Sequence, residues 1–444
     1  MAYIKDTIAA IATPSGKGGV GIVRISGPVA VRIGKEISKR ETEHRVATLV
    51  SFYDDRGRTI DQGLLICFQG PHSFTGEDLI ELQGHGGPVV MDLLLKRAIQ
   101  LGARQAGPGE FSQRAFLNNK IDLVQAEAIA DLINSSSEQA ALGSMRSLQG
   151  DFSNQINSTL KKLVQLRVLV EAAADFPEDG IEAEINKDEK EKLTYLLNQL
   201  DQLLEGAKEG HAFSQGVSLV LTGKPNAGKS SLMNALCKRD VSIVTEIPGT
   251  TRDVVREDAI IEGVTFRILD TAGTRQAKNK IEAEGVKRAL KEVERADIVL
   301  NLVDVSENIE LEMMEELEKN KRAKEIVVYN KVDLLHKKSI PSSFQCVSVK
   351  TGDGLQKLKK RLIKELGVLS GGDSIFSARR RHITAIEQAR IHILEATGFI
   401  GIENQIDLLA EELRLAQLAL DSITGTFTSD DLLGEIFNNF CIGK

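Results

Sequence analysis

The residues with the clearest chemical signature are Gly223–Ser230, which read G-x-x-x-x-G-K-S, the pattern of the phosphate-binding loop of P-loop NTPases. An aliphatic segment typical of a strand, Val217–Leu221, precedes this loop, and a segment with helical character, Ser231–Leu236, follows it. That order gathers backbone N–H groups and a helix N-terminus around one anion, which disfavours a glycine-rich turn without a ligand. We expect Lys229 to reach the β- and γ-phosphates and the Ser230 hydroxyl to bind Mg²⁺.

A second motif, Asn330-Lys331-Val332-Asp333, selects the base of the nucleotide. The Asp333 carboxylate can accept two hydrogen bonds from N1–H and the exocyclic amine of guanine. Adenine lacks this pair of donors and would leave the carboxylate unpaired, which is a large discriminating cost. Asn330 is expected to support the pocket and the stem of Lys331 to stack on the base, while Ser348-Val349-Lys350 fits the last guanine-contacting loop. The predicted ligand is therefore GTP.

Two further segments carry the groups expected to act in hydrolysis. Asp270-Thr271-Ala272-Gly273 is a D-x-x-G motif, in which Asp270 would hold the Mg²⁺ shell and the Gly273 amide would sense the γ-phosphate. The segment Thr245-Glu246-Ile247-Pro248-Gly249-Thr250-Thr251-Arg252-Asp253 reads as a switch loop, with Thr251 as the candidate for the second hydroxyl on Mg²⁺.

The residue that positions the attacking water is less clear from the chemistry. Ras-like enzymes carry a glutamine directly after D-x-x-G, whereas this chain carries Thr274. Glu282 is a nearby carboxylate that can polarise the water, although on chemistry alone a solvated glutamate in a charged loop is favoured. Together, the motifs predict a GTPase whose water is not positioned by the Ras-type glutamine.

The composition limits the class of protein. A length of 444 residues predicts two to four domains, and 42% apolar residues are enough for packed cores. The net charge of −7 excludes nucleic-acid binding through the overall field, so an RNA contact requires a local basic patch or a partner protein. Arg379-Arg380-Arg381-His382 is a basic cluster near a domain boundary, read either as a tRNA contact or as a solvated helix start.

Sequence signals for location and metal binding are weak or negative. The four cysteines are dispersed without metal-ligand spacing, and no run of about 18 apolar residues predicts a membrane span. The N-terminus lacks the apolar run of a signal peptide, so we expect a cytoplasmic protein.

Periodicity divides the chain into four stretches. Residues 1–118 read as an α+β domain, 119–212 as a helical segment, 213–375 as a Ras-like α/β P-loop domain and 376–444 as a second helical segment. The expected fold is therefore multidomain, with one helical domain formed by two chain segments and the nucleotide domain inserted into it. In the first domain, Gly16–Gly21 is expected to be a loop and Gly84–Pro88 a tight turn.

Two charged residues alternate with apolar neighbours in predicted strands of the first domain. Arg24 and Glu81 point either into a cavity or an interface, or onto the solvated face of a half-buried sheet, and the pattern alone favours the solvated face.

Over essentially its whole length, the chain resembles the MnmE (TrmE) family of tRNA modification GTPases. A generic GTPase would have neither the first domain nor the C-terminal tail. The segments that carry the resemblance, besides the nucleotide motifs, are Asp6–Gly27, Phe74–Asp78, Leu82–Pro88, Pro108–Ser112, Leu123–Ile133, Gly249–Asp253, Thr428–Gly434 and the terminal Phe440-Cys441-Ile442-Gly443-Lys444.

The resemblance implies a homodimer that works as a heterotetramer with the flavoprotein MnmG (GidA), which carries FAD. Together they would add an aminomethyl or carboxymethylaminomethyl group to C5 of the wobble uridine, position 34, of certain tRNAs. The one-carbon donor would be 5,10-methylenetetrahydrofolate or its 5-formyl analogue. By motif position, the folate contacts would be Arg24, Glu81, Lys120 and Lys444, which replaces the solvated-face interpretation of the first two.

The resemblance also implies a K⁺ ion in place of an arginine finger, bound by Asn226 and by oxygens of Thr245, Ile247 and Thr250. Glu282 matches the water-positioning glutamate of the family, and the catalytic set becomes Glu282, Lys229, Thr251 and Gly273. A GTPase switch for ribosome assembly, without modification activity, is the alternative. The predicted nucleotide contacts are Asn226, Ala227, Gly228, Lys229, Ser230, Ser231, Thr245, Glu246, Ile247, Pro248, Gly249, Thr250, Thr251, Asp270, Thr271, Ala272, Gly273, Asn330, Lys331, Asp333, Ser348, Val349 and Lys350.

Overall fold

The computed structural model describes residues 6–175, 188–237, 256–270, 296–307, 314, 324–335, 341, 343–367, 376–402, 405–425, 436–437, 440 and 442–443. The chain divides into two compact units. The first unit consists of Met1–Ala130, Leu148–Asp175 and Asp407–Lys444, and the second of Asp131–Ser147 and Phe176–Ile406. None of the described helices is long and apolar enough to cross a membrane.

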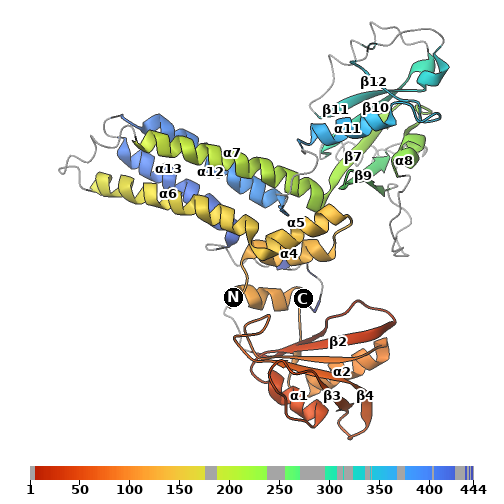
Figure 1. The fold of residues 1–444 in the computed structure, drawn as a ribbon, viewed down its shortest axis with the longest axis vertical. Helices are drawn as coiled ribbons and strands as arrows, with labels where there is room; N and C mark the ends of the chain where they lie inside the picture. The colour runs from red at the N-terminus through yellow and green to blue at the C-terminus, as the bar shows by residue number, and fades with distance from the viewer. Residues whose placement is uncertain are drawn as a thin grey trace, which may run out of the picture. The chain divides into compact units, whose positions relative to one another are not determined.

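A six-stranded sheet with the order β3-β4-β5-β2-β1-β6 forms the N-terminal part of the first unit (Figure 1). Neighbouring strands are antiparallel, except that β1 and β6 are parallel. Helices α1 (Ala30–Ser38) and α2 (Pro88–Gln100) share one apolar core with a face of this sheet, to which Ile33, Ile37 and Leu94 contribute. The strands are β1 Ile8–Ile11, β2 Gly18–Ser26, β3 Thr48–Tyr53, β4 Thr59–Phe68, β5 Leu79–Gly86 and β6 Arg104–Gln105.

Two turn predictions in this sheet were wrong. β2 begins at Gly18, inside the predicted loop, and β5 continues to Gly86, inside the predicted turn. The glycines serve a close approach between the two strands rather than a turn, because a Cβ on Gly86 would lie 2.6 Å from the carbonyl oxygen of Val20. Glycine is therefore needed at Gly86 because β2 and β5 pack too closely for a side chain.

Helices from the two predicted helical segments pack together in each unit. In the first unit, Arg167 of α6 (Asp151–Asp175) donates to the Gln417 side chain of α13 (Ile406–Thr424) at 2.5 Å. In the second unit, Arg390 of α12 (Arg380–Phe399) donates to Asp201 of α7 (Asp188–Gln215) at 2.5 Å. The expected helical domain built from two chain segments is confirmed. The remaining helices are α3 Glu110–Leu117, α4 Leu123–Ile133 and α5 Glu138–Gln149.

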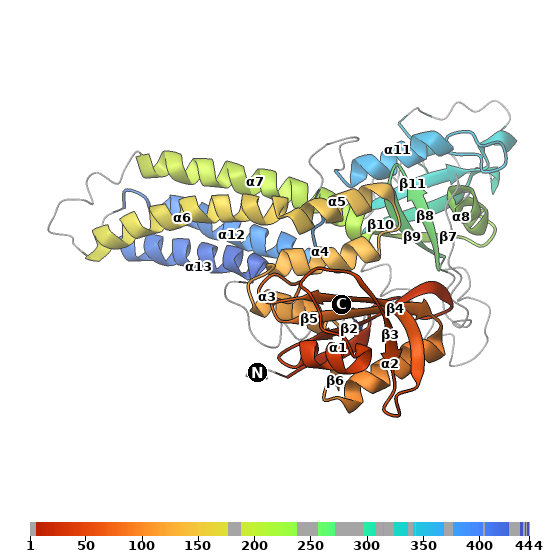
Figure 2. The same cartoon turned by 60° about the horizontal axis from the view of Figure 1, so that its bottom comes forward.

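The second unit contains a six-stranded sheet with the order β12-β11-β10-β7-β9-β8, in which only the β8–β9 pair is antiparallel (Figure 2). Helices α8 (Lys229–Cys237) and α11 (Leu355–Glu365) bury leucines in one core with a face of this sheet. This is the predicted Ras-like P-loop fold. The strands are β7 Val217–Gly223, β8 Arg256–Ile261, β9 Val264–Asp270, β10 Ile298–Asp304, β11 Glu325–Asn330 and β12 Gln345–Cys346.

Candidate functional site

The phosphate-binding loop joins the end of β7 to the start of α8, as the motif requires. Gly228 has a φ of +96°, and a Cβ on it would lie 2.3 Å from Nδ2 of Asn330, so a side chain does not fit there. Lys229 is only 6% exposed, and its Nζ donates to the carbonyls of Gly223 at 2.9 Å and Lys224 at 2.8 Å. The ammonium is thus held inside the curve of the loop, beside the helix N-terminus that favours a phosphate.

The guanine motif is tied directly to this loop. Asn330, which is 2% exposed, donates from Nδ2 to the carbonyl of Ala227 at 2.8 Å and accepts from the Val349 amide at 3.4 Å. The Asp333 side chain is exposed, and its Oδ1 accepts from the Ser348 hydroxyl at 2.6 Å. Ser348 therefore orients the carboxylate while its outer oxygen remains open to a base.

Asp304, which contacts the guanine motif through Lys331, was not predicted from the sequence. Asp304 ends β10 and is 9% exposed; its Oδ2 accepts from Nζ of Lys331, and its Oδ1 accepts from the amide and hydroxyl of Ser306 at 3.0 and 2.6 Å. Burial acts to raise the pKa of Asp304, but the hydrogen bonds from Lys331 and Ser306 hold it below its usual value. Asp304 could have been found from its position at the carboxyl end of a predicted parallel strand, because ligands of α/β sheets bind at that end.

Several predicted site residues lie outside the described part of the chain. These are the switch residues Thr245–Thr251, the residues 271–273 of the D-x-x-G motif, Glu282 and Lys444. For Asp270, the backbone is described as the last residue of β9, which is where the motif predicts it. Asn226, Ser230 and Ser231 are exposed on the loop and the first turn of α8.

The N-terminal domain brings Arg24 and Glu81 together. They face each other in the register of β2 and β5, and Arg24 donates from NH2 to Oε1 of Glu81 at 2.8 Å. Their side chains are 22% and 13% exposed, so the solvated-face interpretation does not hold. The Arg24 guanidinium lies 5.7 Å from the ring centre of Phe74 and 5.8 Å from that of Phe111. The Arg24–Glu81 ion pair and the rings of Phe74 and Phe111 thus form one partly buried site.

Two segments that are distant from Arg24 in sequence lie near this site. Lys120 is exposed, and its aliphatic stem lies beside Gly76, in the loop that carries Phe74. At the other end of the chain, Ile442 forms a β-bridge with Pro108, and Gly443 lies beside Ile11 and Ala12. The Ala12 amide in turn donates to the carbonyl of Ile22, two residues before Arg24. The C-terminal tail therefore lies against the end of β1, the strand that pairs with the Arg24-carrying β2.

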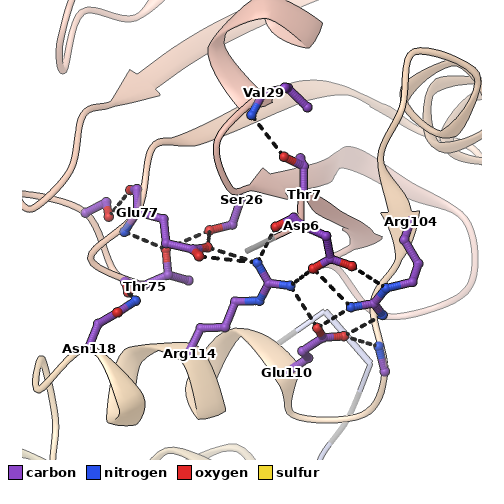
Figure 3. Close-up of polar contacts among 12 residues, drawn as sticks. Asp6, Thr7, Ser26, Val29, Thr75, Glu77, Arg104, Glu110, Arg114 and Asn118 are labelled. Atoms are coloured by element: carbon purple, nitrogen blue, oxygen red, sulfur yellow. Dashed lines mark hydrogen bonds and ion pairs between the residues drawn. The ribbon is translucent and has the colours of Figure 1, made fainter. Parts of the chain in front are cut away.

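An ionic network centred on the buried side chain of Arg114, which no motif indicated, lies in the same domain (Figure 3). Arg114 of α3 is 3% exposed and contacts three carboxylates: Asp6 at 2.6 Å, Glu110 at 3.0 Å and Glu77 at 3.2 Å. Arg104 adds contacts to Asp6 at 2.8 Å and to Glu110 at 2.6 Å. The network joins the start of β1, the loop before β5 and α3.

The network also reaches β2 and sets the charge state of its carboxylates. Ser26 donates to Glu77 at 2.8 Å and lies 2.7 Å from the Thr75 hydroxyl. Hydrogen bonding to Arg104 lowers the pKa of Asp6; for Glu110, burial opposes the arginines, and the pKa is still lowered. Both carboxylates are therefore ionised at neutral pH.

The basic cluster at the start of α12 is partly committed to packing within the second unit. Arg379 contacts Asp131 at 2.8 Å, and the same carboxylate accepts from the Ser377 hydroxyl at 2.5 Å. His382 is buried and accepts from the Arg379 amide through Nδ1 at 3.1 Å. Arg379 and His382 therefore pack at the start of α12 and are partly or fully buried rather than solvated, whereas Arg380 is exposed.

Known proteins match the chain along its whole length. The family model described as GTP-binding protein TrmE N-terminus matches residues 7–120, and the MnmE helical domain model matches residues 123–441. The tRNA modification GTPase MnmE of Saccharophagus degradans is 48% identical over 450 residues, covering 99% of each chain. The proteins of that name from Legionella pneumophila (strain Paris) and Hydrogenovibrio crunogenus are also 48% identical, over 449 and 447 residues, and again cover 99% of each chain.

Proposed function

Since the chain belongs to the MnmE family of tRNA modification GTPases, we propose that its GTP hydrolysis drives the addition of an aminomethyl or carboxymethylaminomethyl group to C5 of the wobble uridine of certain tRNAs. GTP hydrolysis in tRNA modification is the activity of this family. What we propose beyond this activity is the position that is modified, C5 of the wobble uridine, and the chemical group that is added. We further propose that the reaction takes place in the cytoplasm.

The observation that carries the nucleotide part of this proposal is the hydrogen bond from Asn330 to Ala227, together with that from Ser348 to Asp333. The first joins the base-recognising motif to the phosphate loop, and the second orients an exposed carboxylate for the two guanine donors. A site built in this way binds the base and the phosphates of one nucleotide at a fixed separation. That geometry supports GTP as the ligand.

Two residues at the phosphate end of the site, Ser230 and Asn226, support the proposed Mg²⁺ and K⁺ sites. Ser230 is exposed at the start of α8 and would bind Mg²⁺ with Thr251, and Asp270 ends the neighbouring parallel strand. Asn226 is exposed, with a φ of +63°, and would provide a K⁺ ligand with Thr245, Ile247 and Thr250. A bound cation supplies positive charge where the transition state spreads negative charge. Lys229 adds a second positive charge, and Glu282 is proposed to orient the attacking water.

The Arg24–Glu81 pair fits a reduced folate. Glu81 can accept hydrogen bonds from the donor-rich edge of a pterin, and Arg24 and Lys120 can donate to anionic groups. The rings of Phe74 and Phe111 provide apolar faces within 6 Å of the guanidinium. Because Gly443 lies against β1, the terminal Lys444 is proposed as a fourth contact. The bound folate would supply the one-carbon unit.

The proposed assembly is a homodimer that forms a heterotetramer with MnmG, whose FAD would supply the redox chemistry. The proposed domains are residues 1–118 for dimerisation and folate, 213–375 for GTP, and 119–212 with 376–444 for the helical domain. Arg380 is a candidate for a tRNA contact, since it is exposed at the start of the second helical segment.

Mass spectrometry of tRNA nucleosides from a strain that lacks this chain tests the proposal. We expect the aminomethyl-type wobble uridines to disappear and to return when the intact gene is restored. A complementing gene that encodes Lys229→Ala should fail to restore them, because phosphate binding is lost. Unchanged nucleosides in the deletion strain would refute the modification function and favour a switch that acts elsewhere, such as in ribosome assembly.

A further inference from the structure

We propose that Asp304 is a positioning residue for guanine recognition. It holds the Lys331 side chain in the orientation in which its stem lies on the purine ring, and it thereby slows nucleotide dissociation. The inference rests on guanine binding at this site, and not on tRNA modification or on folate. Asp304 belongs to none of the nucleotide motifs.

The position of Asp304 follows from the sheet. β10 and β11 are parallel neighbours, and Asp304 pairs in register with Asn330, the residue before Lys331. A short 3-10 turn, Val305–Glu307, begins directly after β10, and another, Val332–Leu334, begins after Lys331, one residue beyond the end of β11. The ion pair between Asp304 and Lys331 therefore joins the two residues that precede these turns.

The environment of the pair favours a fixed orientation. The Asp304 side chain is 8% exposed and that of Lys331 is 32% exposed, so the carboxylate is anchored inside while the lysine stem borders solvent. Lys331 also has a φ of +66°, an uncommon backbone conformation for a lysine. A free lysine stem samples many rotamers, and one that is held in advance loses less entropy when a base stacks on it.

Both carboxylate oxygens of Asp304 already accept hydrogen bonds from the protein, which supports a positioning role and not a direct contact with the base. Its Oδ2 is occupied by Nζ of Lys331, and its Oδ1 is occupied by the amide and hydroxyl of Ser306. Any effect on the nucleotide must therefore pass through Lys331 or through the 3-10 turn that contains Ser306. These two routes are separable by mutation.

The test measures the dissociation rate of a fluorescent GDP derivative from the full-length protein by stopped flow. We expect Asp304→Asn to raise this rate about tenfold, the scale of one lost charge-assisted hydrogen bond. Lys331→Met, which keeps an aliphatic stem without its anchor, should raise the rate to a similar extent. The double variant should match the single variants, because both changes remove the same interaction.

Two variants separate positioning from a structural role. Ser306→Ala removes the hydroxyl contact of the turn and should leave the rate within twofold of the original. Asp297→Asn alters the carboxylate near the other end of β10, which accepts from the amide and hydroxyl of Ser218 at 2.9 and 2.7 Å, and should also leave it unchanged.

The proposal is overturned if Asp304→Asn stays within twofold of the original rate, or if the double variant shows the product of the two single effects. Should Asp304→Asn fail to fold by circular dichroism, Asp304→Glu, which keeps the charge and displaces it by one methylene, enters the same cycle with Lys331→Met. The test of the modification function uses a strain that lacks this chain and does not depend on these variants. Failure of the Asp304 proposal can therefore be distinguished from failure of the modification function.

Discussion

Replacement of Asp333 by Asn should change the base that the site prefers. In the structure, Oδ1 of Asp333 accepts from the Ser348 hydroxyl at 2.6 Å, which leaves the carboxylate aimed and exposed. An Asn side chain has nearly the same shape, and its amide oxygen still accepts from one donor. Its NH₂ group then faces the second guanine donor, so that one hydrogen bond is lost and two donors oppose each other.

The size of the effect follows from these contacts. A hydrogen bond to a charged group contributes about 1.5–3 kcal/mol, and one is lost outright while the other becomes neutral. The sum of about 3–4 kcal/mol corresponds to a loss of GDP affinity of roughly 10²- to 10³-fold. Xanthine carries a carbonyl where guanine carries its exocyclic amine, so the same Asn should improve binding of xanthosine diphosphate.

Competition against a fluorescent GDP derivative measures both affinities on the full-length protein. The matched control is Asp353→Asn, in the exposed loop after Ser348, where the carboxylate accepts from the Thr351 hydroxyl at 2.7 Å and faces no predicted base contact. The control should stay within twofold for both nucleotides. A variant Asp333→Asn that keeps its GDP affinity within threefold and gains nothing for the xanthine nucleotide would refute the assignment of the guanine pocket.

Four other outcomes are expected. Gly228→Ala should abolish fluorescent-GDP binding with little change in circular dichroism, since its Cβ would lie 2.3 Å from Asn330; unchanged binding would contradict this packing. Replacing K⁺ by Na⁺ should sharply lower GTP turnover, and Asn226→Ala should remove the difference; equal rates in both salts would refute the K⁺ site. Arg114→Leu removes the buried cation that Asp6, Glu77 and Glu110 all contact, and it should cost about 3–5 kcal/mol locally. The loss would be seen as reduced amide protection in β1 and α3, whereas exposed Arg32→Leu should not reduce it. Because the folded pKa values of Asp6 and Glu110 are lowered, the stabilisation from both carboxylates is present above their unfolded pKa values of about 4 and is lost as the pH falls through the folded values. Protection factors in β1 should therefore fall as the pH is lowered below about 4; constant protection would exclude this linkage.

The sequence alone was sufficient to locate the phosphate loop and the guanine motif and to predict the general architecture. The phosphate loop and the guanine motif are contiguous segments whose function depends on their own backbone and on the strand that precedes each of them. Helical spacing likewise exposed the two helical segments on either side of the P-loop domain. Such signals are readable because the interacting groups are near neighbours in the chain.

The structure of the glycine-rich segments could not be predicted from local sequence. A Gly-x-Gly sequence predicts a turn when only the local backbone is considered, yet Gly84–Gly86 continue β5. The deciding fact is the approach of a second strand, whose Val20 carbonyl would lie 2.6 Å from a Cβ at Gly86. Nothing near Gly86 in sequence specifies that neighbour.

The tertiary structure decided which charged groups meet. Asn330 bonds to a carbonyl 103 residues earlier in the chain, and Arg114 contacts a carboxylate 108 residues away. Asp304 reaches Lys331 because β10 and β11 are neighbours in the sheet. Strand order and burial fix these pairs, because a charge removed from water must find a partner in whatever segment the fold places beside it.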